Sequence, residues 1–196
     1  MSSATEKTKR ERAWNESKES VARLVSEFDL QPEAYAIVVN PEKQELYVIQ
    51  NNAVVEIYPI STSIKGIGTR SGSEKTPWGT HRIKEKIGDE VEVGTVFVAR
   101  EPTEKVVEPI TSPIDTNEDL VTTRIMWLEG EEPNINQGSG VDSHSRYIYI
   151  HGTPEEGLIG QPASHGCIRM KNDDVVKLFN TVPTGTLVEI QAREYR

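Results

Sequence analysis

The spacing of the apolar residues changes once along this chain, and the change limits the folds that the chain can adopt. Residues 6–28 repeat apolar side chains at helical spacing, whereas the chain after Gln31 and Pro32 alternates apolar and polar residues with a period of two. The first spacing is typical of an amphipathic helix and the second of half-buried strands. The sequence therefore predicts one long helix followed by a mostly β unit.

The apolar residues of the first segment fall near one helical face, and charged residues fill the rest: Trp14, Val21, Leu24, Val25 and Phe28. Such a stripe predicts a helix that lies on the main domain, and a helix that binds a partner is the alternative. We therefore divide the chain into an N-terminal helical extension, residues 1–31, and a second domain, residues 32–196.

Short runs of β-branched and aromatic residues, separated by turn residues, predict the strands of the second domain. These runs are 36–40, 45–50, 53–61, 81–87, 91–99, 123–129, 146–151 and 186–191. A second, short helix is expected at 173–180, capped by Asn172 or Asp173. The predicted fold class is a single mostly β domain, with a closed or sandwiched sheet, one helix before it and one near its end.

Three segments follow neither spacing. Residues 61–73 are rich in Gly, Ser and Thr, but their glycines do not match a dinucleotide-binding loop. Residues 101–120 and 130–145 are predicted to be long irregular loops, and such loops in a compact domain often bind ligands or act as lids.

The charge balance limits the partners of this chain. Its net charge is −9, and residues 1–31 carry six basic and six acidic side chains, so the acidic excess lies in residues 32–196. An acidic domain repels phosphate backbones, so we expect no nucleic acid partner. Residues 1–30 contain neither the apolar core of a signal peptide nor a membrane span. We therefore expect a cytoplasmic protein; the alternative is a periplasmic or cell-envelope protein whose signal was removed.

The cysteine of this chain lies shortly after a strand-like run that ends at His151 and Gly152. A loop of twelve residues separates His151 from the sequence Ser-His-Gly-Cys at 164–167, and Cys167 is the only cysteine. Acyl transfer by cysteine needs a thiolate, an imidazole that takes its proton, and donors for the developing oxyanion. An adjacent protonated histidine lowers the pKa of a cysteine below its usual value of about 8.5.

Each residue of this stretch suits one part of that chemistry. Cys167 supplies the sulfur, and His151 supplies the base at the end of a strand, where its ring can be held rigidly. Gly166 permits a sharp turn that exposes amide N–H groups beside the sulfur. The backbone carbonyl of Gly152 or Thr153 is expected to orient the ring of His151, as the third member of a triad does.

These residues resemble the catalytic domain of the L,D-transpeptidase family, whose signature is a histidine, a loop and then Ser/Thr-His-Gly-Cys. Residues 76–83, Thr-Pro-Trp-Gly-Thr-His-Arg-Ile, are similar to the Thr-Pro-x-Gly strand entry of that family, and residues 58–61 to the strand before it. The resemblance covers residues 36–191. It implies a β-sandwich-like fold and a thioester on Cys167, with His151 as the base and the Gly152 carbonyl orienting it.

The resemblance also implies roles for the neighbouring residues. The amides of Gly166 and Cys167 would stabilise the oxyanion, and His165 would support the site. Many members have Asn two residues after the cysteine, where this chain has Arg169. An arginine at that position could hold a substrate carboxylate bidentately.

The substrate that the resemblance implies is a peptidoglycan stem peptide or muropeptide, cleaved before its terminal D-alanine without a cofactor. Carbapenems are also implied to acylate Cys167. Because we expect a cytoplasmic protein, we favour an L,D-carboxypeptidase that trims muropeptides during cell-wall recycling. The alternatives are an envelope L,D-transpeptidase that forms crosslinks and a non-catalytic peptide-binding module.

Several of these residues have a structural interpretation as well. Cys167 could be a small buried hydrophobe, or a zinc ligand with His151, His165 and His144, although no metal-ligand spacing supports zinc. Ser164 is interpreted as a turn residue, and His81 and His144 as surface or structural residues. For Arg169, an ion pair with Asp173 or Asp174 that fixes the loop is as good an interpretation as a substrate contact.

Overall fold

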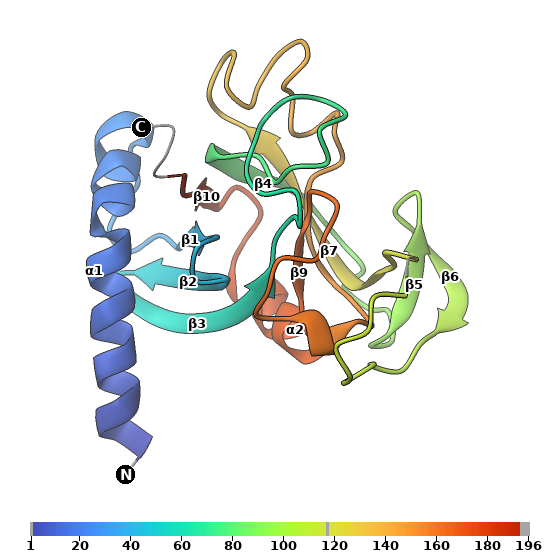
Figure 1. The fold of residues 1–196 in the computed structure, drawn as a ribbon. Coiled ribbons are helices and arrows are strands. Elements are labelled where there is room, and N and C mark those ends of the chain that lie inside the picture. Colours follow the sequence, from blue (N-terminus) through green and yellow to red (C-terminus); the bar gives the residue numbers. More distant parts are fainter. Residues whose placement is uncertain (1, 117, 193–196) are drawn as a thin grey trace.

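The computed structural model describes residues 2–116 and 118–192. The strands of these residues form one sheet, which is closed into a barrel (Figure 1). They are β1 (Ala36–Asn40), β2 (Glu45–Gln50), β3 (Ala53–Ser61), β4 (Gly79–Ile87), β5 (Thr95–Val98), β6 (Glu101–Val106), β7 (Val121–Gly130), β8 (Tyr149–Gly152), β9 (Ile168–Met170) and β10 (Leu187–Ile190). The helices are α1 (Ser2–Phe28), a 3-10 turn (Glu156–Leu158) and α2 (Asn172–Thr181).

The order of strands around the barrel is β4, β10, β1, β2, β3, β9, β8 and β7, and pairing of β4 with β7 closes the ring. The β5–β6 hairpin extends the sheet from β7 and projects from the barrel (Figure 1). Fully buried aliphatic residues of the barrel, such as Ile37, Ile150 and Ile168, form the main core together with Val175 and Leu178 of α2. Helix α2 therefore packs against the barrel with its apolar side.

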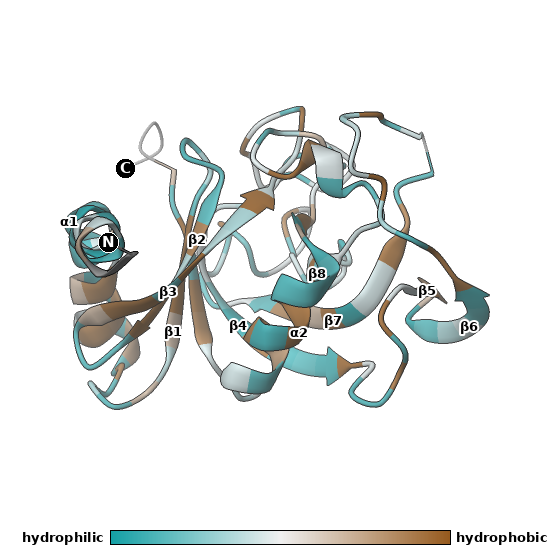
Figure 2. Cartoon of the chain, turned by 90° about the horizontal axis from the view of Figure 1, so that it is seen from below, coloured by the Kyte–Doolittle hydropathy of each residue, from teal (hydrophilic) through white to brown (hydrophobic). Residues whose placement is uncertain are grey.

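Helix α1 lies as a separate layer along β1, β2 and β3 (Figure 2). Its Val21 and Leu24 are buried against Val38 and Tyr47 on the outer face of these strands. Val25 is 47% exposed, so its predicted place in the apolar stripe is wrong. None of the helices in residues 2–116 and 118–192 is long and apolar enough to cross a bilayer.

The mostly β class, the long first helix and the short helix after the cysteine are confirmed, and β1, β2 and β3 have the predicted bounds. The predicted loop 101–120 is partly wrong, because its first six residues pair with β5 as strand β6. The predicted cap of α2 is also wrong. Lys171 occupies the cap position without a side-chain hydrogen bond, and the carboxylate of Glu156 accepts the Asn172 amide at 2.8 Å. The domain division at residue 31 stays a prediction.

Arg23 joins α1 to the barrel through a group of buried polar side chains. Its guanidinium lies 3.1 Å from Glu189 and 2.6 Å from Glu132, and it donates to the Thr80 hydroxyl at 2.6 Å. Glu189 has no exposed surface. A carboxylate buried to this degree is costly without a paired cation.

We expect Arg23→Ala to lower the free energy of unfolding by about 3 kcal/mol, because it removes a cation from a buried carboxylate. The matched control is Arg12→Ala, which removes the more exposed pair of Arg12 with Glu45 and should cost about 1 kcal/mol or less. Urea unfolding of both variants tests this difference. Equal losses would contradict the role assigned to Arg23.

Candidate active site

Strands β8 and β9 place His151 and Cys167 on the same face of the sheet. They pair in parallel, with His151 opposite Arg169 and Ile150 opposite Ile168. Side chains alternate between the two faces of a strand, so His151, Arg169 and the preceding Cys167 share the face away from the isoleucines. The isoleucines belong to the main core, whereas Cys167 packs beside a separate apolar cluster that includes Trp127.

His151 is buried, and its ring is oriented by the adjoining backbone. Its Nδ1 atom lies 2.7 Å from the carbonyl oxygen of Gly152. Because a carbonyl oxygen can only accept a hydrogen bond, Nδ1 carries the proton and Nε2 keeps its lone pair. Burial lowers the pKa of His151 to about 4, although the negative charge of Asp119 acts in the opposite direction. The ring is therefore a neutral base at pH 7.

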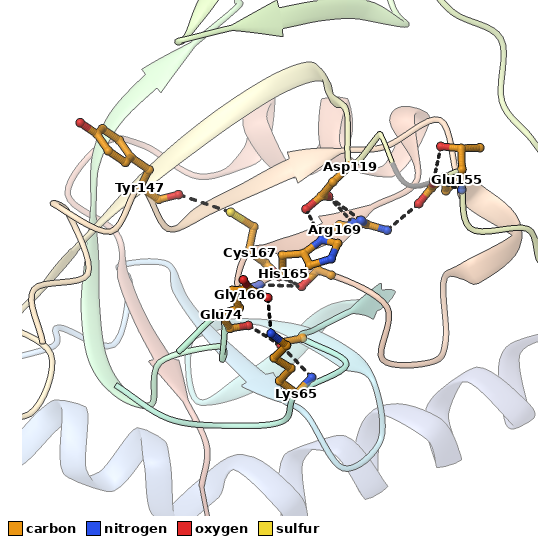
Figure 3. A network of polar contacts seen from close by, with 12 residues as sticks. Lys65, Glu74, Asp119, Tyr147, Glu155, His165, Gly166, Cys167 and Arg169 are labelled. Atoms are coloured by element: carbon orange, nitrogen blue, oxygen red, sulfur yellow. Dashed lines mark hydrogen bonds and ion pairs between the residues drawn. The ribbon is translucent and has the colours of Figure 1, made fainter. Parts of the chain in front are cut away.

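Cys167 is held by the backbone of β8, which also carries His151, and of the residues just before it. Its Sγ donates to the Tyr147 carbonyl at 3.4 Å (Figure 3), and it accepts from the Tyr149 amide at 3.4 Å. Burial raises the pKa of the thiol to about 12, although the Tyr149 amide lowers it. We expected a protonated histidine to lower this pKa. The structure instead has a neutral thiol and a neutral imidazole on one face of the sheet, because both groups are desolvated.

The Ser-His-Gly-Cys turn is shaped by Ser164 and Gly166. Gly166 has a φ of +132°, which a residue with a Cβ rarely adopts. The Ser164 hydroxyl donates to the Cys167 carbonyl at 2.6 Å and accepts from the Gly166 amide at 3.3 Å. Ser164 is thus the turn residue expected from the sequence. The Gly166 amide expected to face an oxyanion is bonded to Ser164 in this state.

The Gly/Ser/Thr-rich segment 61–73 and the residues after it support this turn from one side. The Ile64 amide donates to the Ser164 carbonyl at 3.0 Å, and the Arg146 guanidinium donates to the carbonyls of Thr69 and Lys75 at 3.0 Å and 2.6 Å. The Lys75 carbonyl lies next to Gly166, 3.5 Å from the position that a Cβ would take there. Arg146 therefore fixes this segment against the cysteine turn.

Arg169 is only 1% exposed and is enclosed by two carboxylates. Its Nε lies 2.9 Å from Asp119, its Nη2 also contacts Asp119, and its Nη1 lies 2.7 Å from the buried Glu155 (Figure 3). The alternative of an ion pair with Asp173 or Asp174 is therefore wrong. The expected contact with a substrate carboxylate also has no support, because the guanidinium is buried and already occupied.

Asp119 is the part of the site that the sequence analysis missed. Its second carboxylate oxygen lies 2.7 Å from Nδ1 of His165, whose side chain is exposed. Burial acts to raise the pKa of Asp119, but Arg169, His151 and His165 together hold it below its usual value. The acid-rich segment 101–120 gave no spacing that would single out this aspartate; its length alone indicated a binding or lid role.

The remaining histidines are structural. His81 is buried, with its ring nitrogens 3.0 Å from the Gly79 carbonyl and 2.9 Å from the Ser143 hydroxyl. The His144 ring stacks on Trp127 with centroids 3.9 Å apart. Across residues 2–116 and 118–192, no group of three or more His, Cys, Asp or Glu side chains could hold a metal ion.

The neutral state of Cys167 and His151 predicts how the reactivity of the thiol depends on pH. Alkylation of Cys167 by iodoacetamide should accelerate about tenfold per pH unit from pH 6 to pH 9, as expected for a thiol titrating above that range. Mass spectrometry measures the rate unambiguously, because Cys167 is the only cysteine. The urea-unfolded chain is the control and should level off near the ordinary cysteine pKa of about 8.5. A constant rate between pH 5 and pH 8 would instead indicate a thiolate–imidazolium pair.

Comparison with known proteins gives a consistent match. The YkuD L,D-transpeptidase catalytic domain matches residues 34–190. The chain is 45% identical over 69 residues to the putative L,D-transpeptidase YqjB of Bacillus subtilis, a match that covers 32% of this chain and 39% of YqjB. It is 26% identical over 156 residues to the probable L,D-transpeptidase YcfS of Escherichia coli, which covers 79% of this chain and 43% of YcfS. The chain thus spans less than half the length of these two relatives.

A solved structure shares the fold. The Ldtfm–avibactam carbamoyl enzyme superposes with a TM-score of 0.50 at 18% identity, over 83% of this chain and 50% of that one. The family match covers most of the barrel and includes His151 and the Ser-His-Gly-Cys turn. This chain therefore belongs to the L,D-transpeptidase catalytic domain family.

Proposed function

We propose that this protein is a cysteine L,D-carboxypeptidase. It cleaves the bond between the L-centre of the third, diamino acid residue of a peptidoglycan stem and the terminal D-alanine. Water then releases the shortened peptide. The proposal includes the cytoplasmic location expected from the sequence and soluble muropeptides as substrates, so that the enzyme trims them during cell-wall recycling.

The observation that carries the proposal is the orientation of His151. Its Nδ1 proton is held by the Gly152 carbonyl at 2.7 Å, so Nε2 is the atom that can accept a proton. Cys167 directly precedes β9, and the alternation of side chains places it on the same face as His151 of β8. A nucleophile, a base and a group that orients the base are the three parts of a covalent acyl-transfer site.

The first step joins a proton transfer to the attack. The thiol leaves the Tyr147 carbonyl and gives its proton to Nε2 of His151, while Sγ attacks the carbonyl carbon of the third residue. Because the thiol pKa is about 12 and the His151 pKa about 4, little thiolate exists at rest. Proton transfer therefore accompanies attack, and Asp119 stabilises the imidazolium as it forms.

The remaining steps use the same groups in reverse. The amides of Cys167 and Gly166 stabilise the oxyanion, the latter after the Ser164 hydroxyl has released it. The protonated His151 gives its proton to the amine of the departing D-alanine, and the acyl group stays on Sγ as a thioester. His151 then takes a proton from water, whose oxygen attacks the thioester. The C–S bond breaks, the peptide leaves as the acid, and His151 returns the proton to Sγ.

Our preference for water over an amine rests on the expected cytoplasmic location, and a segment that we call the strap, residues 110–116 and 118–120, supports it. Ile110 exchanges hydrogen bonds with Pro154 and Gly157 at 2.7 Å and 2.9 Å, and Thr116 donates to Glu155. A Cβ on Gly157 would lie 2.2 Å from the Ser112 carbonyl, so the strap packs tightly there. The strap thus packs on the turn that follows His151 and Gly152, and its Asp119 contacts Arg169. We infer that it leaves less room for a second stem peptide than for water.

The test uses a disaccharide tetrapeptide with and without excess D-amino acid or a second stem. We expect tripeptide as the main product in every case, with Cys167→Ala reducing turnover by at least about 10³-fold while its melting temperature stays near that of the wild type. Mass spectrometry measures the products of both enzymes. It also detects the adduct that we expect imipenem to form on Cys167. Dominant amine exchange or crosslinked dimers would favour a transpeptidase, and turnover by Cys167→Ala would refute the mechanism.

A further inference from the structure

The turn of the β5–β6 hairpin has an unfavourable backbone that presents an arginine. Val98 pairs with Glu101, so the turn contains two residues, Ala99 and Arg100. Their φ angles are +49° and +72°. Two-residue turns of this kind strongly prefer Asn-Gly, because residues with a Cβ are strained in the left-handed region. Such strain commonly occurs at functional sites.

The side chain of Arg100 lies over the aromatic residues that border the cysteine. Its Cζ is 4.4 Å from the centre of the Trp127 ring and 5.2 Å from that of Tyr147, and Nη1 donates to the Tyr149 hydroxyl at 3.3 Å. Among residues 2–116 and 118–192, no Asp or Glu forms an ion pair with this guanidinium, and Glu85 acts on its charge only from a longer distance. Arg100 thus differs from Arg169, whose charge is fully compensated by carboxylates.

Tyr149 contacts both the sulfur of Cys167 and the guanidinium of Arg100, so it fixes how far apart the two groups lie. Its amide lies 3.4 Å from Sγ of Cys167, and its hydroxyl lies 3.3 Å from Arg100. The guanidinium is therefore about one tyrosine side chain away from the nucleophile. Tyr147, whose carbonyl also contacts Sγ, is 53% exposed, and its ring lies beside the same guanidinium.

The distance between Arg100 and Sγ decides which carboxylate of a bound stem peptide the guanidinium can reach. The carboxylate of the departing D-alanine is only one residue from the attacked carbonyl, and it must stay close to the sulfur. A carboxylate at the far end of the third residue's side chain extends about as far from the attacked carbonyl as Arg100 lies from Sγ. Its methylene groups could cover the exposed Tyr147 ring.

We infer that Arg100 is a specificity-determining residue that binds a carboxylate at the end of the third residue's side chain. The favoured stem then contains a diamino diacid at this position, rather than a diamino acid whose side chain ends in an amine alone. A bidentate guanidinium–carboxylate contact supplies both the orientation and the selectivity. This inference rests on the proposed function.

The experiment compares two tetrapeptides that differ only in this carboxylate, one with a diamino diacid and one with lysine at position three. The wild type should show a kcat/KM about tenfold higher for the diacid, the scale of one charged hydrogen-bonded contact. Arg100→Gly should remove the preference by lowering kcat/KM for the diacid peptide and leaving the lysine peptide unchanged. Arg100→Lys should keep only part of it.

Stability separates binding from a structural role. Glycine relieves the left-handed strain at position 100, so Arg100→Gly should melt at the wild-type temperature or above it. Lys105→Ala, which removes a cation from the same hairpin, should change neither the melting temperature nor the selectivity.

Equal kcat/KM for the two peptides in the wild type, or a lower melting temperature of Arg100→Gly with both peptides affected alike, would overturn the inference. Failure of the wild type to cleave either peptide would refute the proposed function itself, and the inference that rests on it.

Discussion

The buried guanidinium of Arg169 is the interaction on which the geometry of the site depends. A cation with 1% of its surface exposed is tolerated only with paired carboxylates, and here these are Asp119 and Glu155. Asp119 belongs to the strap, Glu155 to the turn that follows β8, and Arg169 to β9. Three segments that are distant in sequence therefore meet at one charge, two residues after the cysteine.

This arrangement has an electrostatic consequence for the chemistry. Desolvation keeps the thiol and the imidazole neutral at rest, with pKa values of about 12 and about 4. Asp119 is charged, because Arg169 and the hydrogen bond with His165 favour its ionised form against the effect of burial. The site thus holds a fixed negative charge where an imidazolium would form, and the charge stabilises that ion more than the resting ring.

The local part of this structure could be predicted from the sequence, and the long-range part could not. Alternating residues gave β1 to β3, and the Ser-His-Gly-Cys sequence singled out Cys167. Strand β9 has three residues, too few for a period to appear, and β6 contains charges and a proline. The partners of Arg169 lie 50 and 14 residues away, so the sequence favoured nearby Asp173 and Asp174 instead. The predicted cap of α2 was wrong for a similar reason. The side chain of Asn172 accepts hydrogen bonds from Thr122 and Thr123, which are distant in sequence.

The central claim is that Asp119 supports His151 electrostatically as well as structurally. The most direct measurement is the pH dependence of D-alanine release in a single turnover, for the wild type, Asp119→Asn and the control Glu118→Gln on the same strap. We predict that Asp119→Asn slows acylation by about 10- to 100-fold, the scale of one preorganised charge. The acidic limb of its profile should move to lower pH, because the imidazolium loses its counter-charge. An unchanged rate and limb in a stably folded Asp119→Asn would contradict the account.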